Sequence, residues 1–138
     1  MATGDSSGKR VLIVDDEPVN RLVLGRMVEY FGACAVEVES AAQALEVLSA
    51  QVVDLVLMDI HMPQMTGIQA VERLRATPGP NTQVPVVAVT GDTTLACRDY
   101  VALGFDGYAN KPVSLADVER MLDSRRVLAA QQPRLAVR

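Results

Sequence analysis

The stretch Val11-Leu12-Ile13-Val14-Asp15-Asp16 decides the fold, because a short apolar run ends abruptly on two acids. Residues 55–59 (LVLMD) and 86–90 (VVAVT) repeat this arrangement, and residues 108–112 (YANKP) form a weaker version of it. Continuous apolar runs of about four to eight residues are typical of strands that are buried on both faces of a parallel sheet. The runs therefore predict parallel strands whose carboxyl ends carry acids, a hydroxyl and an amine.

Helix patterns alternate with these strands. Strands are expected over 10–14, 35–38, 55–58, 86–89 and 107–110. Helices are expected over 18–30, from Ser40 to about 50, over a segment marked by Ile68, Val71 and Leu74 that ends by Pro78, over about 94–103, and from Ser114 to about Leu128. Pro18 suits a first helical turn, and Ser40 and Ser114 suit N-caps. Five strands alternating with five helices predict a three-layer α/β sandwich, with a parallel sheet and right-handed crossovers.

The pattern also predicts which side chains are buried. The first helix is expected to bury an apolar face at helical spacing, made of Val19, Leu22, Val23, Met27 and Tyr30. Cys34 and Cys97 lack CxxC spacing and are too few for a disulfide framework, so both are expected to be small buried residues in a reducing compartment. Three methionines are expected to fill gaps near the strand ends: Met58, Met62 and Met65.

Length and composition indicate one globular domain. The chain has 138 residues, of which 49% are hydrophobic and 22% are charged. We expect a flexible lead over 1–8, a folded domain over 9–128 and a tail over 129–138. The net charge of −4 gives no reason to expect nucleic acid or an acidic membrane as a partner. The chain shows no signal peptide and no apolar stretch that could span a bilayer, so a cytoplasmic location is expected.

The acids at the strand ends predict a metal site. In an open α/β sheet, ligands bind beyond the carboxyl ends of the strands, so Asp15, Asp16 and Asp59 should lie close together. Three neighbouring carboxylates repel one another, and a hard divalent cation removes the repulsion. Mg²⁺ prefers one or two carboxylates, several waters and a phosphate oxygen. One carboxylate then remains free to act as a nucleophile that forms an aspartyl phosphate.

The other strand ends offer the groups that phosphoryl transfer requires. This reaction depends mainly on positioning and on positive charge around the phosphoryl oxygens. The metal would take one oxygen, Lys111 a second, and the Thr90 hydroxyl with nearby backbone N–H groups a third. Lys9 and Lys111 are the only lysines of the chain. The ordered set of acids, hydroxyl and amine therefore predicts a phosphoryl-transfer site.

The residues that carry this set resemble a known family. The stretches VLIVDDEPVN, LVLMDIHMPQMTG, VPVVAVTGD and GYANKPV resemble the receiver domains of response regulators in bacterial two-component signalling, over residues 9–128. Asn20 after the acid pair, together with MDIHMPQMTG and KPV, resembles most the receivers of hybrid sensor kinases. The resemblance implies a flavodoxin-like fold with strand order 2-1-3-4-5.

The resemblance also implies a role for each site residue. Asp59 is implied as the phosphoacceptor, and Mg²⁺ is implied as the cofactor. Asp15, Asp16 and Asp59, with the backbone carbonyl of His61, are implied as the metal ligands. Lys111 is implied to contact the phosphoryl group.

A conformational switch is implied by the same resemblance. Thr90 is drawn towards the phosphoryl oxygens and Tyr108 turns inwards, which changes an exposed partner surface formed by Tyr108, Ala109, Asn110, Val118 and Met121. His61 and Asp92 stand at positions that tune the lifetime of the phosphoryl group. The implied partners are a histidine kinase or histidine phosphotransfer protein as donor and a downstream protein as target. Direct DNA binding is not expected, because no DNA-binding segment follows Leu128, and the oligomeric state stays open.

Simpler structural roles compete with these functional ones. Asp15 and Asp16 could cap the following helix. Lys111 could be a solvated loop residue, and Thr90 a β-branched strand terminus. Tyr108 could pack without switching, because its switch role rests on the resemblance. The side chain of His61, the only histidine, is expected to be an ordinary loop residue.

Other protein classes fit less well. A phosphatase of the haloacid-dehalogenase kind needs a second acid two residues after the nucleophile, where this chain has His61. A flavin-binding electron carrier of similar fold lacks support, because the chain has no tryptophan and few aromatic residues. No GxxxxGK[ST] or GxSxG motif is present. A degenerate receiver that binds partners without phosphorylation conflicts with the intact set of site residues. We therefore expect a signalling module that promotes its own aspartyl phosphorylation and dephosphorylation, rather than a turnover enzyme.

Overall fold

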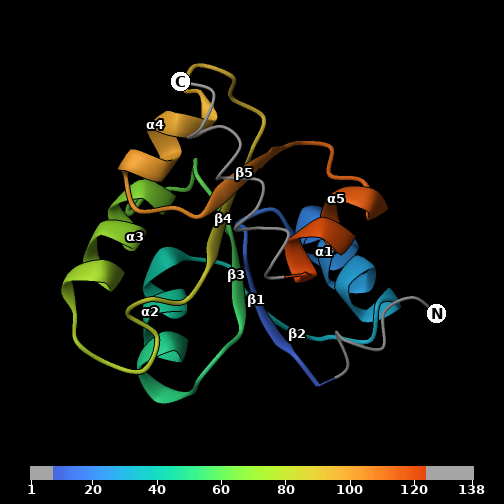
Figure 1. Ribbon diagram of the computed structural model, residues 1–138, viewed down its shortest axis with the longest axis horizontal. Helices are drawn as coiled ribbons and strands as arrows, with labels where there is room; N and C mark the ends of the chain where they lie inside the picture. Colours follow the sequence, from blue (N-terminus) through green and yellow to red (C-terminus); the bar gives the residue numbers. More distant parts are fainter. Residues whose placement is uncertain (1–7, 124–138) are drawn as a thin grey trace.

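The computed structural model describes residues 8–123, in which five parallel strands form one sheet with helices on both faces (Figure 1). The strands are β1 (Arg10–Val14), β2 (Cys34–Val38), β3 (Leu55–Asp59), β4 (Val86–Thr90) and β5 (Gly107–Asn110). The helices are α1 (Pro18–Tyr30), α2 (Ala41–Ala50), α3 (Gly67–Ala76), α4 (Cys97–Ala102) and α5 (Leu115–Leu122). The three-layer α/β sandwich predicted from the sequence is confirmed.

The strand order is β2-β1-β3-β4-β5, and every pairing is parallel. In the register of the three central strands, Val14 lies opposite Met58, and Asp59 lies opposite Val89. The residues that follow β1 and the last residues of β3 and β4 therefore meet at one edge of the sheet. The predicted flavodoxin-like order is confirmed.

Two hydrophobic cores lie on opposite sides of the sheet, because successive strand residues point to opposite faces. Leu12, Val14, Val56 and Met58 face the core that α2, α3 and α4 cover. The intervening strand residues face the core under α1 and α5; these include Val11, Ile13, Leu55 and Leu57. Figure 1 shows these two groups of helices on either side of the sheet. The continuous apolar runs of the sequence follow from this burial on both faces.

The expected boundaries agree with the structure to within about two residues, except at the start of α4 and at the end of α5. Helix α4 begins at Cys97 rather than near Thr94. The carboxylate of Asp92 accepts hydrogen bonds from the backbone N–H and the hydroxyl of Thr94, which forms a local turn in place of a first helical turn. The expected extension of α5 to about Leu128 is wrong, because the helix ends at Leu122 and its C-cap, Asp123, has an extended backbone. Most of the expected lead and all of the expected tail lie outside the described residues.

The apolar face expected for α1 is wrong. Val19 is 67% exposed, Leu22 is 51% exposed and Val23 is 45% exposed, and Tyr30 is exposed as well. The helix instead buries the side that carries Leu24, Gly25 and Val28; of the expected residues, Met27 packs partly against this core. Gly25 lies at this contact, since a Cβ there would be 2.4 Å from the Glu37 carboxylate and 3.7 Å from the Cβ of Ala35, both on β2.

Two further expectations about burial are corrected. Cys34 is exposed, because it lies at the start of the edge strand β2, which the helices cover only in part. Val118 and Met121 are buried under the sheet in the core that α5 shares with α1, so they are no part of an exposed partner surface. Met58 and Met62 are buried as expected, and Met65 packs partly against the same core.

Within residues 8–123, no helix is both long enough and apolar enough to cross a membrane.

We predict that Gly67, the first residue of α3, cannot carry a side chain. A Cβ at Gly67 would lie 2.4 Å from the backbone carbonyl oxygen of Asp59. The backbone N–H of Gly67 also donates a hydrogen bond to the carbonyl of Ile60 at 2.9 Å, which holds the residue in this position. Gly67→Ala should lower the free energy of unfolding by about 1–3 kcal/mol, because this overpacking is against backbone. Urea unfolding measures the change.

Gly79→Ala is the matched control, because a Cβ at Gly79 meets nothing within 4 Å. Its effect should stay within about 0.5 kcal/mol or be slightly stabilising. Equal effects of the two substitutions would contradict the packing argument.

Candidate active site at the carboxyl edge of the sheet

Three carboxylates gather where β1 and β3 end. One ligand atom from each of Asp15, Asp16 and Asp59 lies within 4.8 Å of the others. Asp15 and Asp59 are buried, and Asp16 is exposed. The parallel register of β1 and β3 places the three acids together, as the sequence predicted.

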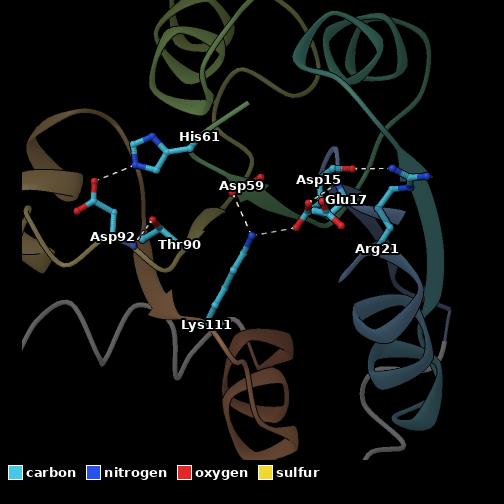
Figure 2. A network of polar contacts seen from close by, with 8 residues as sticks. All are labelled: Asp15, Glu17, Arg21, Asp59, His61, Thr90, Asp92 and Lys111. Atoms are coloured by element: carbon cyan, nitrogen blue, oxygen red, sulfur yellow. Dashed lines mark hydrogen bonds and ion pairs between the residues drawn. The ribbon is translucent and has the colours of Figure 1, made fainter. Parts of the chain in front are cut away.

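Lys111 is the cation that compensates these acids. Its Nζ lies 3.3 Å from Asp59 Oδ1 and 3.2 Å from Asp15 Oδ2, and Figure 2 shows the side chain reaching between the two acids. The backbone N–H of Lys111 donates to the carbonyl of Thr90 at 2.9 Å, which fixes the start of the loop after β5. The peptide bond between Lys111 and Pro112 is cis. Lys111 is therefore part of the site rather than a solvated loop lysine.

The charges of the site shift the pKa values of two residues, Asp59 and Lys111. Burial and the neighbouring charge of Asp15 raise the pKa of Asp59 from 3.8 to about 6, although Lys111 opposes the shift. Burial alone would lower the pKa of Lys111, but the charges of Asp59 and Asp15 outweigh it, so this pKa lies above its usual value. Asp59 is therefore a carboxylate whose charge is incompletely compensated.

Asp15 is held in place by its neighbours along the chain. Its Oδ1 accepts a hydrogen bond from the backbone N–H of Glu17 at 2.8 Å, and its carbonyl accepts one from Arg21 at 2.8 Å. Its Oδ2 is buried and has no hydrogen-bond partner, because Lys111 meets it at an ion-pair distance but in poor hydrogen-bond geometry. No pattern in the sequence predicted the contact with Arg21. A buried carboxylate oxygen without a hydrogen bond, in a residue that lies beside two other acids, fits a metal ligand.

Helix capping does not account for the acid pair. The N-cap of α1 is Glu17, and its side chain makes no capping hydrogen bond. Asp15 stabilises the turn before the helix through its Oδ1, while its Oδ2 lies 3.2 Å from the Nζ of Lys111. The structure thus favours the site role over the capping role.

Thr90 lies at the same edge, but its hydroxyl is turned away from the acids. The Thr90 Oγ1 accepts a hydrogen bond from the backbone N–H of Asp92 at 2.9 Å, and Figure 2 shows it pointing towards Asp92 rather than towards Lys111. In this conformation Thr90 lies beside the site without contacting Asp59.

His61 and Asp92 are joined by a hydrogen bond at the rim of the site. The Nε2 of His61 lies 2.9 Å from Asp92 Oδ2, and this contact links the loop after β3 to the loop after β4 (Figure 2). Hydrogen bonds from Thr94 and then from His61 lower the pKa of Asp92 to about 2. The side chain of His61 therefore has a specific partner, which the expectation of an ordinary loop residue missed.

Tyr108 on β5 is half-buried and packs against the core under α4. Its ring stacks on Tyr100 with centroids 5.5 Å apart and an angle of 20° between the ring planes. Sequence reasoning singled out Tyr108 but not its stacking partner.

The donor set fits a hard divalent cation. Carboxylate oxygens are the ligands that Mg²⁺ prefers, and one exposed acid leaves room for the waters that Mg²⁺ retains. The repulsion among the acids and the raised pKa of Asp59 are the features that a bound cation would relieve. The arrangement joins a nucleophilic carboxylate, a metal-binding acid pair and an ammonium group, which together suit phosphoryl transfer.

Comparison with known proteins supports this interpretation. The sequence profile of the response regulator receiver domain matches residues 11–123. The sensor protein GacS of Pseudomonas syringae pv. syringae is 36% identical over 131 residues, which cover 93% of this chain and 14% of that protein. The chain therefore spans about one seventh of the length of this curated relative.

Solved structures of the same fold agree. A CheY-like receiver domain from Methylobacillus flagellatus is 32% identical, with a TM-score of 0.77, over 86% of this chain and 98% of that one. The receiver domain of the sensor histidine kinase PA1611 from Pseudomonas aeruginosa is 30% identical, with a TM-score of 0.77, over 88% of this chain and 98% of that one. That domain was solved with a magnesium ion coordinated in its active-site cleft. The resemblance to receivers of sensor kinases is thus confirmed, and the chain belongs to the family of response regulator receiver domains.

Proposed function

We propose that this receiver accepts a phosphoryl group from a phosphohistidine onto Asp59, with Mg²⁺ held by Asp15, Asp16, Asp59 and the backbone carbonyl of His61. The observation that carries the proposal is the geometry of Asp59: it is buried, it adjoins two other acids, and Lys111 lies 3.3 Å from its Oδ1. Phosphorylated aspartate and Mg²⁺ at an acidic pocket are general features of the family.

Asp59 is better suited to attack than the other acids. Asp15 has one oxygen bound to a backbone N–H and the other buried 3.2 Å from Lys111, so neither oxygen is free to attack, and Asp15 is better suited to be a ligand. Lys111 contacts Oδ1 of Asp59, which leaves Oδ2 to attack phosphorus. An O–P bond forms, the P–N bond of the phosphohistidine breaks, and its electron pair returns to the imidazole nitrogen.

The remaining groups stabilise the charge of the phosphoryl oxygens. Bound Mg²⁺ neutralises the acid pair and supplies a ligand position for one oxygen. Lys111 already contacts Asp59, so it is positioned to contact a second oxygen of a phosphoryl group on that residue. Thr90 would have to leave its bond to Asp92 before its hydroxyl could donate to a third. This movement, with Tyr108, is the proposed switch, and it controls a downstream protein.

The donor of the phosphoryl group is a histidine kinase or a histidine phosphotransfer protein. An apolar groove of about 260 Å³ lies between α1 and the loop after β5, and it is lined by residues that include Val23, Met27, Lys111 and Pro112. Because Lys111 belongs to both the groove and the site, a protein that delivers phosphohistidine to Asp59 must approach beside this groove. We propose that the histidine-bearing face of the donor docks on the exposed Val19, Leu22 and Val23 of α1.

We propose that the receiver promotes its own phosphorylation and dephosphorylation as a signalling module rather than as a turnover enzyme. The matched residues 11–123 support the expected domain over 9–128. Histidine kinases take their phosphoryl group from ATP, so we propose that this domain works in the cytoplasm.

Acetyl phosphate with Mg²⁺ should add one phosphoryl group to the parent protein and none to Asp59→Asn, because the amide cannot attack phosphorus. Intact-mass analysis measures the addition. Asp54→Asn, an exposed acid at the opposite edge of the sheet, should be modified like the parent. An unmodified parent, or equal modification of Asp59→Asn, would remove the nucleophile assignment.

The pKa of Asp59 predicts a pH dependence of stability in the absence of metal. Its folded-state pKa of about 6 exceeds the unfolded value of 3.8, so the folded state binds more protons between these values and stability falls as pH rises through them. Asp59→Asn removes this penalty. Its melting temperature should therefore exceed that of the parent by more at about pH 7.5 than at about pH 5 in EDTA.

Mg²⁺ should reverse the effect by compensating the ionised acid. The rise in melting temperature on adding Mg²⁺ should be larger at about pH 7.5 than at about pH 5, because protons compete with the metal for Asp59. A Mg²⁺ effect independent of pH, or undiminished in Asp59→Asn, would argue against this ligand set.

Docking on α1 predicts a selective defect. Val23→Glu should slow phosphoryl transfer from a phosphorylated histidine phosphotransfer domain by about tenfold or more, because a charge replaces an apolar contact at the centre of the interface. Phosphorylation by acetyl phosphate should change by less than about twofold. Val52→Glu, at another exposed valine that lies before β3, is the control, and similar slowing by both variants would exclude α1 as the docking surface.

A further inference from the structure

Asp15 is held at three of its polar groups, and each bond comes from a different segment. Its backbone N–H donates to the carbonyl of Val38 at 3.2 Å, and its Oδ1 accepts a hydrogen bond from the backbone N–H of Glu17 at 2.8 Å. Its carbonyl oxygen accepts a hydrogen bond from the side chain of Arg21 at 2.8 Å. The orientation of Asp15 is therefore fixed by β2, by the turn after β1 and by α1.

Arg21 is a half-buried arginine near the start of α1. Its guanidinium binds a peptide carbonyl, and among residues 8–123 it forms no ion pair with a carboxylate. Figure 2 shows this side chain meeting Asp15 on the side away from Lys111. A hydrogen bond from a charged donor is stronger than one between neutral groups, so Arg21 holds the turn firmly.

The carbonyl that Arg21 binds belongs to the peptide unit between Asp15 and Asp16. A peptide unit is planar, so a bond to its oxygen also fixes the direction in which the chain continues to Asp16. Asp16 is exposed, and in the described part of the chain its carboxylate makes no hydrogen bond of its own. The place of Asp16 beside Asp15 and Asp59 therefore depends on its backbone.

We propose that Arg21 is a positioning residue for the acid pair: it holds the peptide between Asp15 and Asp16 so that both carboxylates meet Asp59 and bind Mg²⁺ together. This inference rests on the proposed function, because it takes the acid pair as Mg²⁺ ligands. Hydrogen bonds that orient metal ligands in this way typically change metal affinity by about 10- to 100-fold.

The charge of Arg21 acts in the opposite direction to its hydrogen bond. A guanidinium near the acids repels a divalent cation, so its charge alone would weaken Mg²⁺ binding. Removal of Arg21 should tighten Mg²⁺ binding if the charge dominates, and weaken it if the hydrogen bond to Asp15 dominates. The sign of the change therefore separates the two roles.

Arg21→Met removes the charge and the donor but keeps a long side chain that favours a helix. We expect its dissociation constant for Mg²⁺, measured by isothermal titration calorimetry, to be about tenfold or more above that of the parent. Arg26→Met makes the same chemical change at an exposed position of the same helix and should alter the constant by less than about twofold. Melting temperatures in EDTA check that both variants are folded.

Two further readouts separate positioning from a general structural role. With acetyl phosphate, the Mg²⁺ concentration for half-maximal phosphorylation of Arg21→Met should rise about tenfold, while the rate at saturating Mg²⁺ should change by less than about twofold, because Asp59 and Lys111 are intact. In EDTA, the Glu17 amide should exchange its hydrogen faster in Arg21→Met than in the parent, since this N–H donates to Asp15.

Arg21→Lys keeps the charge and one donor, and it serves as the test if Arg21→Met does not fold. Positioning predicts that Arg21→Lys binds Mg²⁺ more tightly than Arg21→Met, or within about tenfold of the parent if only the lysine variant folds. A role through charge alone predicts that Arg21→Lys binds Mg²⁺ more weakly than Arg21→Met, or like the parent.

Weaker Mg²⁺ binding by Arg21→Met, with Arg26→Met unchanged, supports the inference, as does an affinity of Arg21→Lys between those of the parent and Arg21→Met. Equal or tighter binding by Arg21→Met, equal weakening in Arg26→Met, or an Arg21→Lys variant that alone folds and binds like the parent overturns it while the proposed function stands. A parent protein that binds no Mg²⁺ overturns the proposed ligand set and this inference with it.

Discussion

The constraint on which this structure depends is the repulsion among carboxylates held at neighbouring strand ends. Two unit charges about 4 Å apart repel by about 4 kcal/mol at an effective dielectric constant near 20. Asp15 and Asp59 are buried side by side, and Lys111 is the cation that contacts both. The compensation is incomplete, as the raised pKa of Asp59 records. A fold selected for stability alone would not keep this arrangement, and the resulting attraction for a cation and a phosphoryl group is its chemical consequence.

The parallel sheet maintains this unfavourable arrangement because its register places the acids that follow β1 beside the acid that ends β3. Val14 pairs with Met58, so the residues beyond them emerge at the same level. A slip of one residue would draw Asp59 in among apolar side chains, and burying a carboxylate without partners costs several kcal/mol. Gly67 completes the constraint from the other side, since α3 starts within contact distance of the Asp59 backbone. The two apolar cores thus provide the free energy that holds the acids together.

The sequence predicted the parts of the molecule whose position along the chain determines their position in space. Buried parallel strands leave continuous apolar runs, so the strands, their order by resemblance, and the residues at their ends could all be predicted. Helix boundaries followed from caps such as Ser40 and Ser114, whose side chains do accept the capping hydrogen bonds. The face of α1 could not be predicted, because its apolar residues surround the helix and the contact point is Gly25, which carries no side chain.

What the sequence could not predict depends on the direction in which a side chain points. Tyr100 has the spacing of any core residue of a helix, and nothing in its neighbours along the chain indicates that its ring stacks on Tyr108. The hydrogen bond between His61 and Asp92 joins two loops 31 residues apart in the chain and has no local pattern. The backbone N–H of Asp92 also binds the Thr90 hydroxyl, and this bond determines where the hydroxyl points. The acids and the lysine of the candidate site could be predicted because they lie at strand ends, whereas the bond that the proposed movement of Thr90 must break is defined only by the three-dimensional structure.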